Sequence, residues 1–285
     1  MAPTGPLAPL NVHHLLAAGA LTDPGAVLDS ADGGATWSAL AALPGDVLDI
    51  DFPNATKGYV ALCDPQSDVV KLEVSVDGGH TWSSRSILPD YRGGDVSGLW
   101  MTSGGDGLLV TTWGDPGCAR SGVGPATVWA TDDGGRSWAK AARVPVPVAL
   151  STASFVSSRS GSTSASDDWT GWSEGGQDHP ELTFNGGRTW EEEPTFPLLG
   201  TVQLVSPKVM LGWGTNSHGT PVFWYSANGG GRWAQRALPV ATYLSAGPAT
   251  LAFANIRDGW ATSAATHEIW ATTDAGLHWL LVSHP

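Results

Sequence analysis

The sequence is poor in cysteine, in basic residues and in long apolar segments. Of 285 residues, 2 are cysteine and 14 are Lys or Arg, against 27 Asp or Glu, which gives a formal net charge of −13. A field of that sign repels phosphate backbones and anionic lipid surfaces, so we expect no nucleic-acid partner. No apolar run approaches the roughly 18–20 residues that a membrane-spanning helix needs, and no signal peptide is visible, so we expect no membrane insertion.

Glycine, proline and tryptophan are abundant instead, with 37, 20 and 15 residues. Glycine and proline divide a chain into turns, whereas tryptophan supplies large buried area. An apolar content of 41% provides enough material for a core. The composition therefore indicates an all-β protein built of many short strands.

One short pattern, Ser/Thr-x-Asp/Asn-x-Gly-x-Ser/Thr-Trp, recurs along the chain, and we call it the box. Four copies are complete and two are degenerate: Ser30–Trp37, Ser75–Trp82, Thr131–Trp138, Thr183–Trp190, Ser226–Trp233 and Thr272–Trp279. The tryptophans are separated by 43 to 56 residues, about the length of one four-stranded propeller blade.

Strand-like runs flank each box, so the box is predicted to be a hairpin turn. The Asp or Asn side chain accepts hydrogen bonds from nearby backbone N–H groups, and the glycines tolerate positive φ. The tryptophan ring is predicted to insert between neighbouring sheets. We assign a structural role to these residues: Asp32, Trp37, Asp77, Trp82, Asp133, Trp138, Asn185, Trp190, Asn228, Trp233, Asp274 and Trp279.

The box resembles the Asp-box, or bacterial neuraminidase repeat, of sialidases, sortilin-type receptors, xyloglucanases and photosystem II stability/assembly factors. The resemblance covers nearly the whole chain. In repeat pattern it is most similar to the assembly-factor repeat. A Gly-aromatic pair precedes several boxes, at Gly58-Tyr59, Gly171-Trp172, Gly212-Trp213 and Gly259-Trp260. As a signature the repeat is specific for the fold and weak for function.

The expected fold is a single all-β domain over residues 1–285, a six-bladed β-propeller of four-stranded antiparallel blades with a box between strands three and four. Blade two is predicted as Asp46–Phe52, Gly58–Cys63, Val69–Val76 and Thr81–Leu88. Residues 1–12 are interpreted as an irregular or truncated segment, which leaves blade one short of its innermost strand. Either this segment closes the ring, or the natural chain begins further upstream and adds a seventh blade.

Function is expected on the face opposite the boxes, which we call the open face, because the connections from strand two to three emerge there. Aromatic and polar side chains at this level suit a sugar or an extended peptide. The candidate ligand-binding residues are Trp113, Asp115, Trp172, Glu174, Asp178, His179, Asn216, His218 and His267. Trp213 lies at the same level as Trp113 and Trp172, and the alternative for Trp172 and Trp213 is packing between blades.

No metal or cofactor is expected. His179, His218 and His267 fall in equivalent loops of three blades, and such loops are commonly too far apart for Zn–N bonds of about 2.0–2.1 Å. The Ser-rich run Ser157–Ser166 is interpreted as an enlarged loop between strands one and two of its blade.

The sequence leaves open whether the protein is an enzyme. A sialidase needs an arginine triad, but Arg136, Arg188 and Arg232 lie inside box turns on the wrong face. Another glycoside hydrolase would need two facing carboxylates in a deep channel, one with a raised pKa. Acidic candidates on the open face are Asp46, Asp49, Asp64, Asp95, Asp115, Glu174 and Asp178, although a chain of this charge carries such residues by composition alone.

Cys63 and Cys118 are predicted on equivalent connections of adjacent blades, either bridged or free. A disulfide would indicate an oxidising compartment. The resemblance implies a non-catalytic, extracytoplasmic scaffold that binds a protein or glycan partner on the open face. The alternative is a secreted glycoside hydrolase. We expect the protein to be a monomer.

Overall fold

The structure is a computed structural model. It describes residues 3–20, 23–64, 66–67, 69–86, 94–113, 126–143, 149–156, 160–166, 179–186, 188–189, 191–192, 199–215, 221–236, 250–262, 266 and 268–283. Among these residues no helix has the length and hydropathy needed to cross a membrane.

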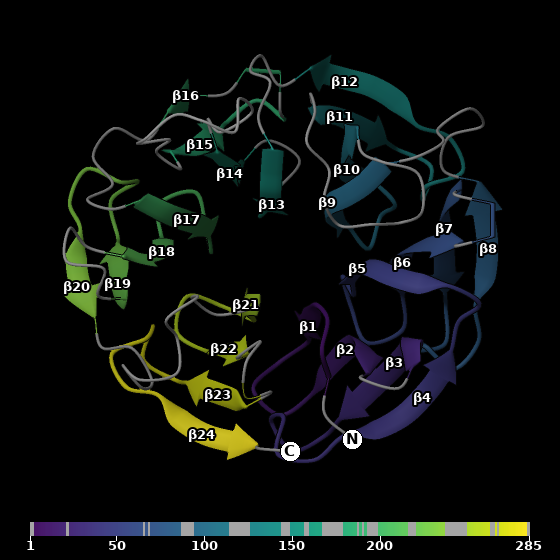
Figure 1. The fold of residues 1–285 in the computed structure, drawn as a ribbon, viewed down its shortest axis with the longest axis horizontal. Helices are drawn as coiled ribbons and strands as arrows, with labels where there is room; N and C mark the ends of the chain where they lie inside the picture. Colours follow the sequence, from purple (N-terminus) through teal and green to yellow (C-terminus); the bar gives the residue numbers. More distant parts are fainter. Residues whose placement is uncertain are drawn as a thin grey trace.

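The described strands form six four-stranded antiparallel sheets, arranged as blades around a central axis (Figure 1). Blade 1 comprises β1 (Leu7–Pro9), β2 (Leu15–Ala20), β3 (Asp23–Ser30) and β4 (Ser38–Ala42). Blade 2 comprises β5 (Asp46–Asp51), β6 (Gly58–Asp64), β7 (Val69–Ser75) and β8 (Ser83–Ser86). Blade 3 comprises β9 (Gly94–Met101), β10 (Gly107–Trp113), β11 (Ala126–Thr131) and β12 (Ala139–Arg143).

The second half of the chain repeats this arrangement. Blade 4 comprises β13 (Ala149–Phe155), β14 (Gly161–Ser166), β15 (His179–Thr183) and β16 (Glu191–Glu192). Blade 5 comprises β17 (Leu199–Leu204), β18 (Met210–Thr215), β19 (Pro221–Ser226) and β20 (Ala234–Arg236). Blade 6 comprises β21 (Thr250–Phe253), β22 (Gly259–Thr262), β23 (Ile269–Thr272) and β24 (Leu280–Ser283). In each blade the first strand lies nearest the axis (Figure 1).

The first blade has its innermost strand, which corrects the expectation of an incomplete blade one and of a seventh blade. β1 pairs with β2 in the register Leu7↔Ala17 to Pro9↔Leu15. Blade 1 then packs directly on blade 6, where the indole N–H of Trp260 donates to the carbonyl oxygen of Gly33 at 2.9 Å. The proline-rich composition concealed this strand, but an innermost strand uses only one edge for pairing, so it tolerates proline. The closed contact leaves no place for another blade.

Blade 4 brings a second correction. Gly161–Ser166, part of the run interpreted as a loop, is the strand β14. Its first residue pairs with Phe155 on one side and with the box residue Thr183 on the other. Gly58 of blade 2 pairs in the same way with the box residue Ser75. The second strand of blade 4 therefore begins at Gly161, ahead of the Gly171-Trp172 pair, because pairing with β13 and β15 decides its position, although its side chains are small and polar.

The box folds as a hydrogen-bonded hairpin, as blade 2 illustrates. Ser75 Oγ accepts from the buried N–H of Gly79 at 2.8 Å and donates to Asp77 Oδ1 at 2.8 Å. The backbone N–H and the hydroxyl of Thr81 donate to the two carboxylate oxygens of Asp77. These bonds lower the pKa of Asp77 to about 2. Gly78 and Gly79 have φ of 77° and 94°, a conformation that favours glycine.

The cores lie between blades rather than inside them. Trp82, for example, contacts Phe52 edge to face at 6.0 Å between ring centroids and belongs to a cluster that joins blades 1 and 2. The described box tryptophans each pack in a cluster of their own blade and the preceding one: Trp37, Trp82, Trp138, Trp233 and Trp279. Each indole therefore joins two sheets.

Replacing Trp82 by alanine should lower the free energy of unfolding by about 3 kcal/mol, because it opens a cavity between blades 1 and 2. Urea unfolding followed by circular dichroism would measure the loss. Trp82→Phe should cost less, and Val76→Ser, at a box position that is 70% exposed, should change stability by less than about 0.5 kcal/mol. Equal losses for Trp82→Ala and Val76→Ser would contradict the role given to the indole.

Candidate functional site

The predicted open-face site falls almost entirely outside the described residues. Trp113 ends β10 and His179 begins β15, but only their backbone is described. The other seven candidates lie outside the described residues: Asp115, Trp172, Glu174, Asp178, Asn216, His218 and His267. The open-face site therefore stays a prediction.

Two described residues on the open face of blade 2 have structural partners. Cys63, at the end of β6, is 1% exposed and disulfide-bonded. The only other cysteine of the chain, Cys118, lies outside the described residues. Asp64 follows directly and pairs with Lys71 Nζ at 2.9 Å. The hydrogen bond from Lys71, aided by the N–H of Gln66, lowers the pKa of Asp64 to about 2, so this carboxylate is unsuited to donate a proton at neutral pH.

Two carboxylates of the innermost strand β5 connect blade 2 to blade 3. Asp49 and Asp51 are two residues apart and so project from the same side of the strand. Asp49 Oδ2 accepts from the backbone N–H of Leu99 at 2.7 Å, and Asp51 Oδ2 accepts from that of Met101 at 2.6 Å. Both N–H groups belong to β9, whose channel-side edge has no neighbouring strand within its sheet. The carboxylates thus supply acceptors that a sheet edge lacks.

Burial raises the pKa of Asp51 to about 7, against the opposing hydrogen bond from Met101, and the charge of Asp49 adds to the rise. Part of the Asp51 surface remains accessible. A raised pKa beside a second carboxylate is what a hydrolase would require, but each group is held by a backbone N–H of the next blade. The described residues contain no group of three or more His, Cys, Asp or Glu side chains that could hold a metal ion.

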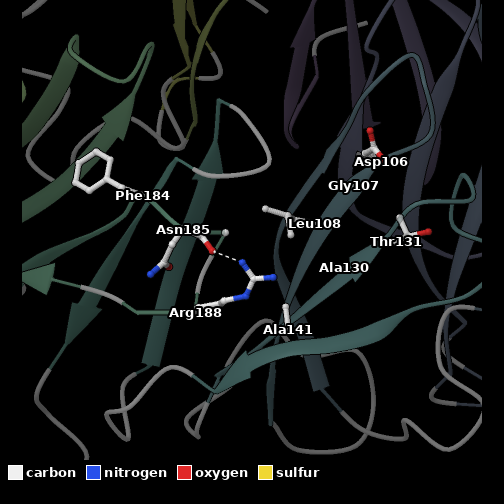
Figure 2. Close-up of a pocket in the computed structure, with 10 residues that line it drawn as sticks. Asp106, Gly107, Leu108, Ala130, Thr131, Ala141, Phe184, Asn185 and Arg188 are labelled. Carbon is white, nitrogen blue, oxygen red and sulfur yellow. Dashed lines mark hydrogen bonds between the residues drawn. The ribbon is translucent and has the colours of Figure 1, made fainter.

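A cavity of about 460 Å³ lies between blades 3 and 4, on the side of the boxes (Figure 2). Blade 3 contributes one wall and the box of blade 4 the other: Asp106, Gly107, Leu108, Ala130, Thr131 and Ala141, then Phe184, Asn185, Gly186 and Arg188. Arg188 Nη1 donates to the backbone oxygen of Asn185 at 3.4 Å. Sequence reasoning missed this cavity, and the signal that could have found it is the alanine-rich strand Ala139–Arg143.

The molecule has the architecture of known propellers. A scan against protein-family models found no match, and no curated protein matches in sequence. Among solved structures, YCF48 bound to D1 peptide is similar, with a TM-score of 0.61 and 16% identity over 98% of this chain and 82% of that one. YCF48 from Cyanidioschyzon merolae is also similar, with a TM-score of 0.56 and 15% identity, over 92% of this chain and 80% of that one. This chain has a β-propeller fold.

A carbohydrate-active enzyme shares that fold. The GH74 xyloglucanase from Xanthomonas campestris gives a TM-score of 0.62 and 15% identity over 99% of this chain. The present propeller spans 55% of that enzyme's length. At identities this low, the likeness concerns the fold alone and assigns neither ligand nor activity.

Asp51 should make the protein less stable as the pH rises. The folded state holds its proton up to about pH 7, whereas an unfolded chain releases it near 3.8. The free energy of unfolding should therefore fall between about pH 4 and pH 7, by at most about 4 kcal/mol. Asp51→Asn keeps an acceptor for the Met101 N–H and should remove this fall, so that the variant exceeds the parent at pH 8 in urea unfolding.

Asp64→Asn is the control of opposite sign. The pKa of Asp64 is lowered to about 2, so its contribution is present above about pH 4 and lost as the pH falls through 2. This variant should be less stable than the parent at neutral pH. Parallel stability profiles of the parent and Asp51→Asn between pH 4 and pH 8 would refute the assignment to Asp51.

Proposed function

We propose that the protein is a non-catalytic, extracytoplasmic scaffold that binds a protein or glycan partner on its open face. The observation that carries this proposal is that three described carboxylates which could have served catalysis are held by structural partners. Asp49 and Asp51 accept backbone N–H groups of β9, and Asp64 is paired with Lys71. The box carboxylates are likewise occupied by hydrogen bonds within their turns, as for Asp77.

Two further observations support the proposal. The disulfide at Cys63 favours an oxidising compartment, since such bonds are rare in the cytosol. A propeller of similar extent, YCF48, has been solved bound to D1 peptide, which demonstrates that this architecture can hold a peptide in that protein. The Asp-box resemblance of the repeats agrees with a propeller that presents loops from rigid blades.

The second candidate function is glycoside hydrolysis. It is favoured by the raised pKa of Asp51 next to the carboxylate of Asp49, and by the fold shared with the GH74 xyloglucanase. In this alternative Asp51 would hold the proton given to the leaving group. The two candidates differ in whether Asp51 is needed for turnover.

Open-face and box-face variants would test the scaffold proposal. The full-length protein would be used to capture and crosslink partners from the exported fraction of its source cells. Trp113→Ala and Asp115→Ala should reduce recovery of a specific partner at least about tenfold, since interface aromatic residues dominate binding. Val76→Ser on the box face is the control and should leave recovery unchanged. If only Val76→Ser reduced recovery of the partner, the interface would lie on the box face, which would contradict the proposal.

Assays with aryl glycosides and xyloglucan oligosaccharides would separate the two candidates. The scaffold proposal expects no turnover by the parent protein. Turnover that Asp51→Asn abolishes while the variant remains folded would establish the hydrolase and overturn the proposal.

A further inference from the structure

The cavity between blades 3 and 4 lies beside a repeated position that has a small side chain in blade 3. At four of the other interfaces, a residue of the outermost strand lies against the next box. Leu40 lies against Gly79, and Val282 lies against Gly34. Arg85 and Arg236 reach the backbone oxygens of Gly134 and Asp274 in the following blades.

Blade 3 has an alanine at this position. The register of β11 with β12 shifts between Val128 and Trp129, which leaves Ala141 as the extra residue of a bulge. Blade 1 has the same shift between Val27 and Leu28, and there the extra residue is Leu40. A methyl group thus replaces an isobutyl group. Three of the residues that line the opening, Asp106, Phe184 and Arg188, are exposed, so a ligand can enter it from solvent.

The lining combines an apolar floor with one cationic group, Arg188, and one carboxylate, Asp106. Leu108, which is 4% exposed, forms the floor together with Ala130 and Ala141. The guanidinium of Arg188 points from the opposite wall toward Leu108 and Ala141 (Figure 2). Its single described hydrogen bond is long, at 3.4 Å, and no described carboxylate pairs with it. A guanidinium has five N–H donors and binds carboxylates with two of them at once.

We propose that this cavity binds a small organic acid that carries a branched aliphatic group. The aliphatic group occupies the space that Leu40 fills in blade 1, and the carboxylate pairs with Arg188. The volume of about 460 Å³ lies within the range of small-molecule sites. The site is on the box side of the ring, so it is independent of the function proposed for the open face.

The probe is N-acetyl-leucine, which has both the carboxylate and the isobutyl group. Titration followed by calorimetry or ligand-observed NMR should give a dissociation constant of about 1 mM, as expected for so few atoms. N-acetyl-leucinamide, which lacks the charge, and acetate, which lacks the apolar group, should each bind at least about tenfold more weakly. A short peptide ending in leucine tests whether the ligand can be the C-terminus of a peptide. Binding equal to that of N-acetyl-leucine identifies a peptide C-terminus as the ligand, and weaker binding identifies a free organic acid.

Two substitutions and one matched control locate the site. Ala141→Leu recreates the side chain of blade 1 and should weaken binding of N-acetyl-leucine at least about tenfold, as should Arg188→Gln. Arg136→Gln is the control, because Arg136 has the same box position in blade 3, where its Nη1 donates to Asp133 O at 2.8 Å, and Leu72 and Arg85 already fill that interface. It should leave binding unchanged. Circular dichroism and melting temperature would verify that each variant is folded.

Failure of the parent protein to bind N-acetyl-leucine at about ten times the expected dissociation constant would overturn the proposal. So would unchanged binding by a folded Ala141→Leu variant, or an equal loss with Arg136→Gln. If the cavity were only a packing void, Ala141→Leu would raise the melting temperature while no probe bound to any variant.

Discussion

The wedging of box tryptophans between neighbouring blades is the contact on which the molecule depends. A four-stranded blade has two faces, and both need a neighbour to exclude water. The tight hairpin around Asp77 holds Trp82 where it meets Phe52 and the residues of blade 1. The polar turn and the apolar core thus depend on each other, since the hydrogen bonds of the turn fix the position of the indole. Because each blade contacts mainly its two neighbours, the ring behaves like a closed repeat protein.

The innermost strands pose a different problem, because each has an edge without a neighbouring strand. Between blades 2 and 3 the solution is a pair of aspartates that accept the N–H groups of Leu99 and Met101. This arrangement gives Asp51 a raised pKa for a structural reason. Acidic residues in the channel of a propeller therefore need a test of their hydrogen-bond partners before they are taken as catalytic.

The repeat predicted much of the fold. In blade 2 each strand starts and ends within about two residues of its predicted bounds, because the box fixes the hairpin and the spacing then fixes the rest. The predictions were wrong in two segments whose amino-acid composition is unusual for a strand but whose neighbours in the fold are strands. Leu7–Pro9 is a strand despite the prolines around it, and Gly161–Ser166 is a strand despite its serines. Pairing with neighbouring strands decided both, and such pairing is not encoded locally.

The candidate site was less predictable than the fold. The open-face residues are loop residues, whose positions depend on tertiary contacts rather than on a repeat, and most of them lie outside the described residues. The cavity beside Arg188 could have been inferred by aligning the outermost strands of the blades, because the alanine-rich strand Ala139–Arg143 has Ala141 where blade 1 has Leu40. Its neighbour Arg188 was visible in the sequence as a box residue, but its exposure to an unfilled interface was not.

The hydrogen bond from Trp260 to Gly33 joins residues 227 positions apart in the chain. The other blade interfaces connect segments that are close in sequence, so their formation costs less chain entropy. Assembly should proceed around the ring and finish at this seam, where blade 6 meets blade 1. The seam is then also the place where the disc would first come apart under thermal or mechanical stress.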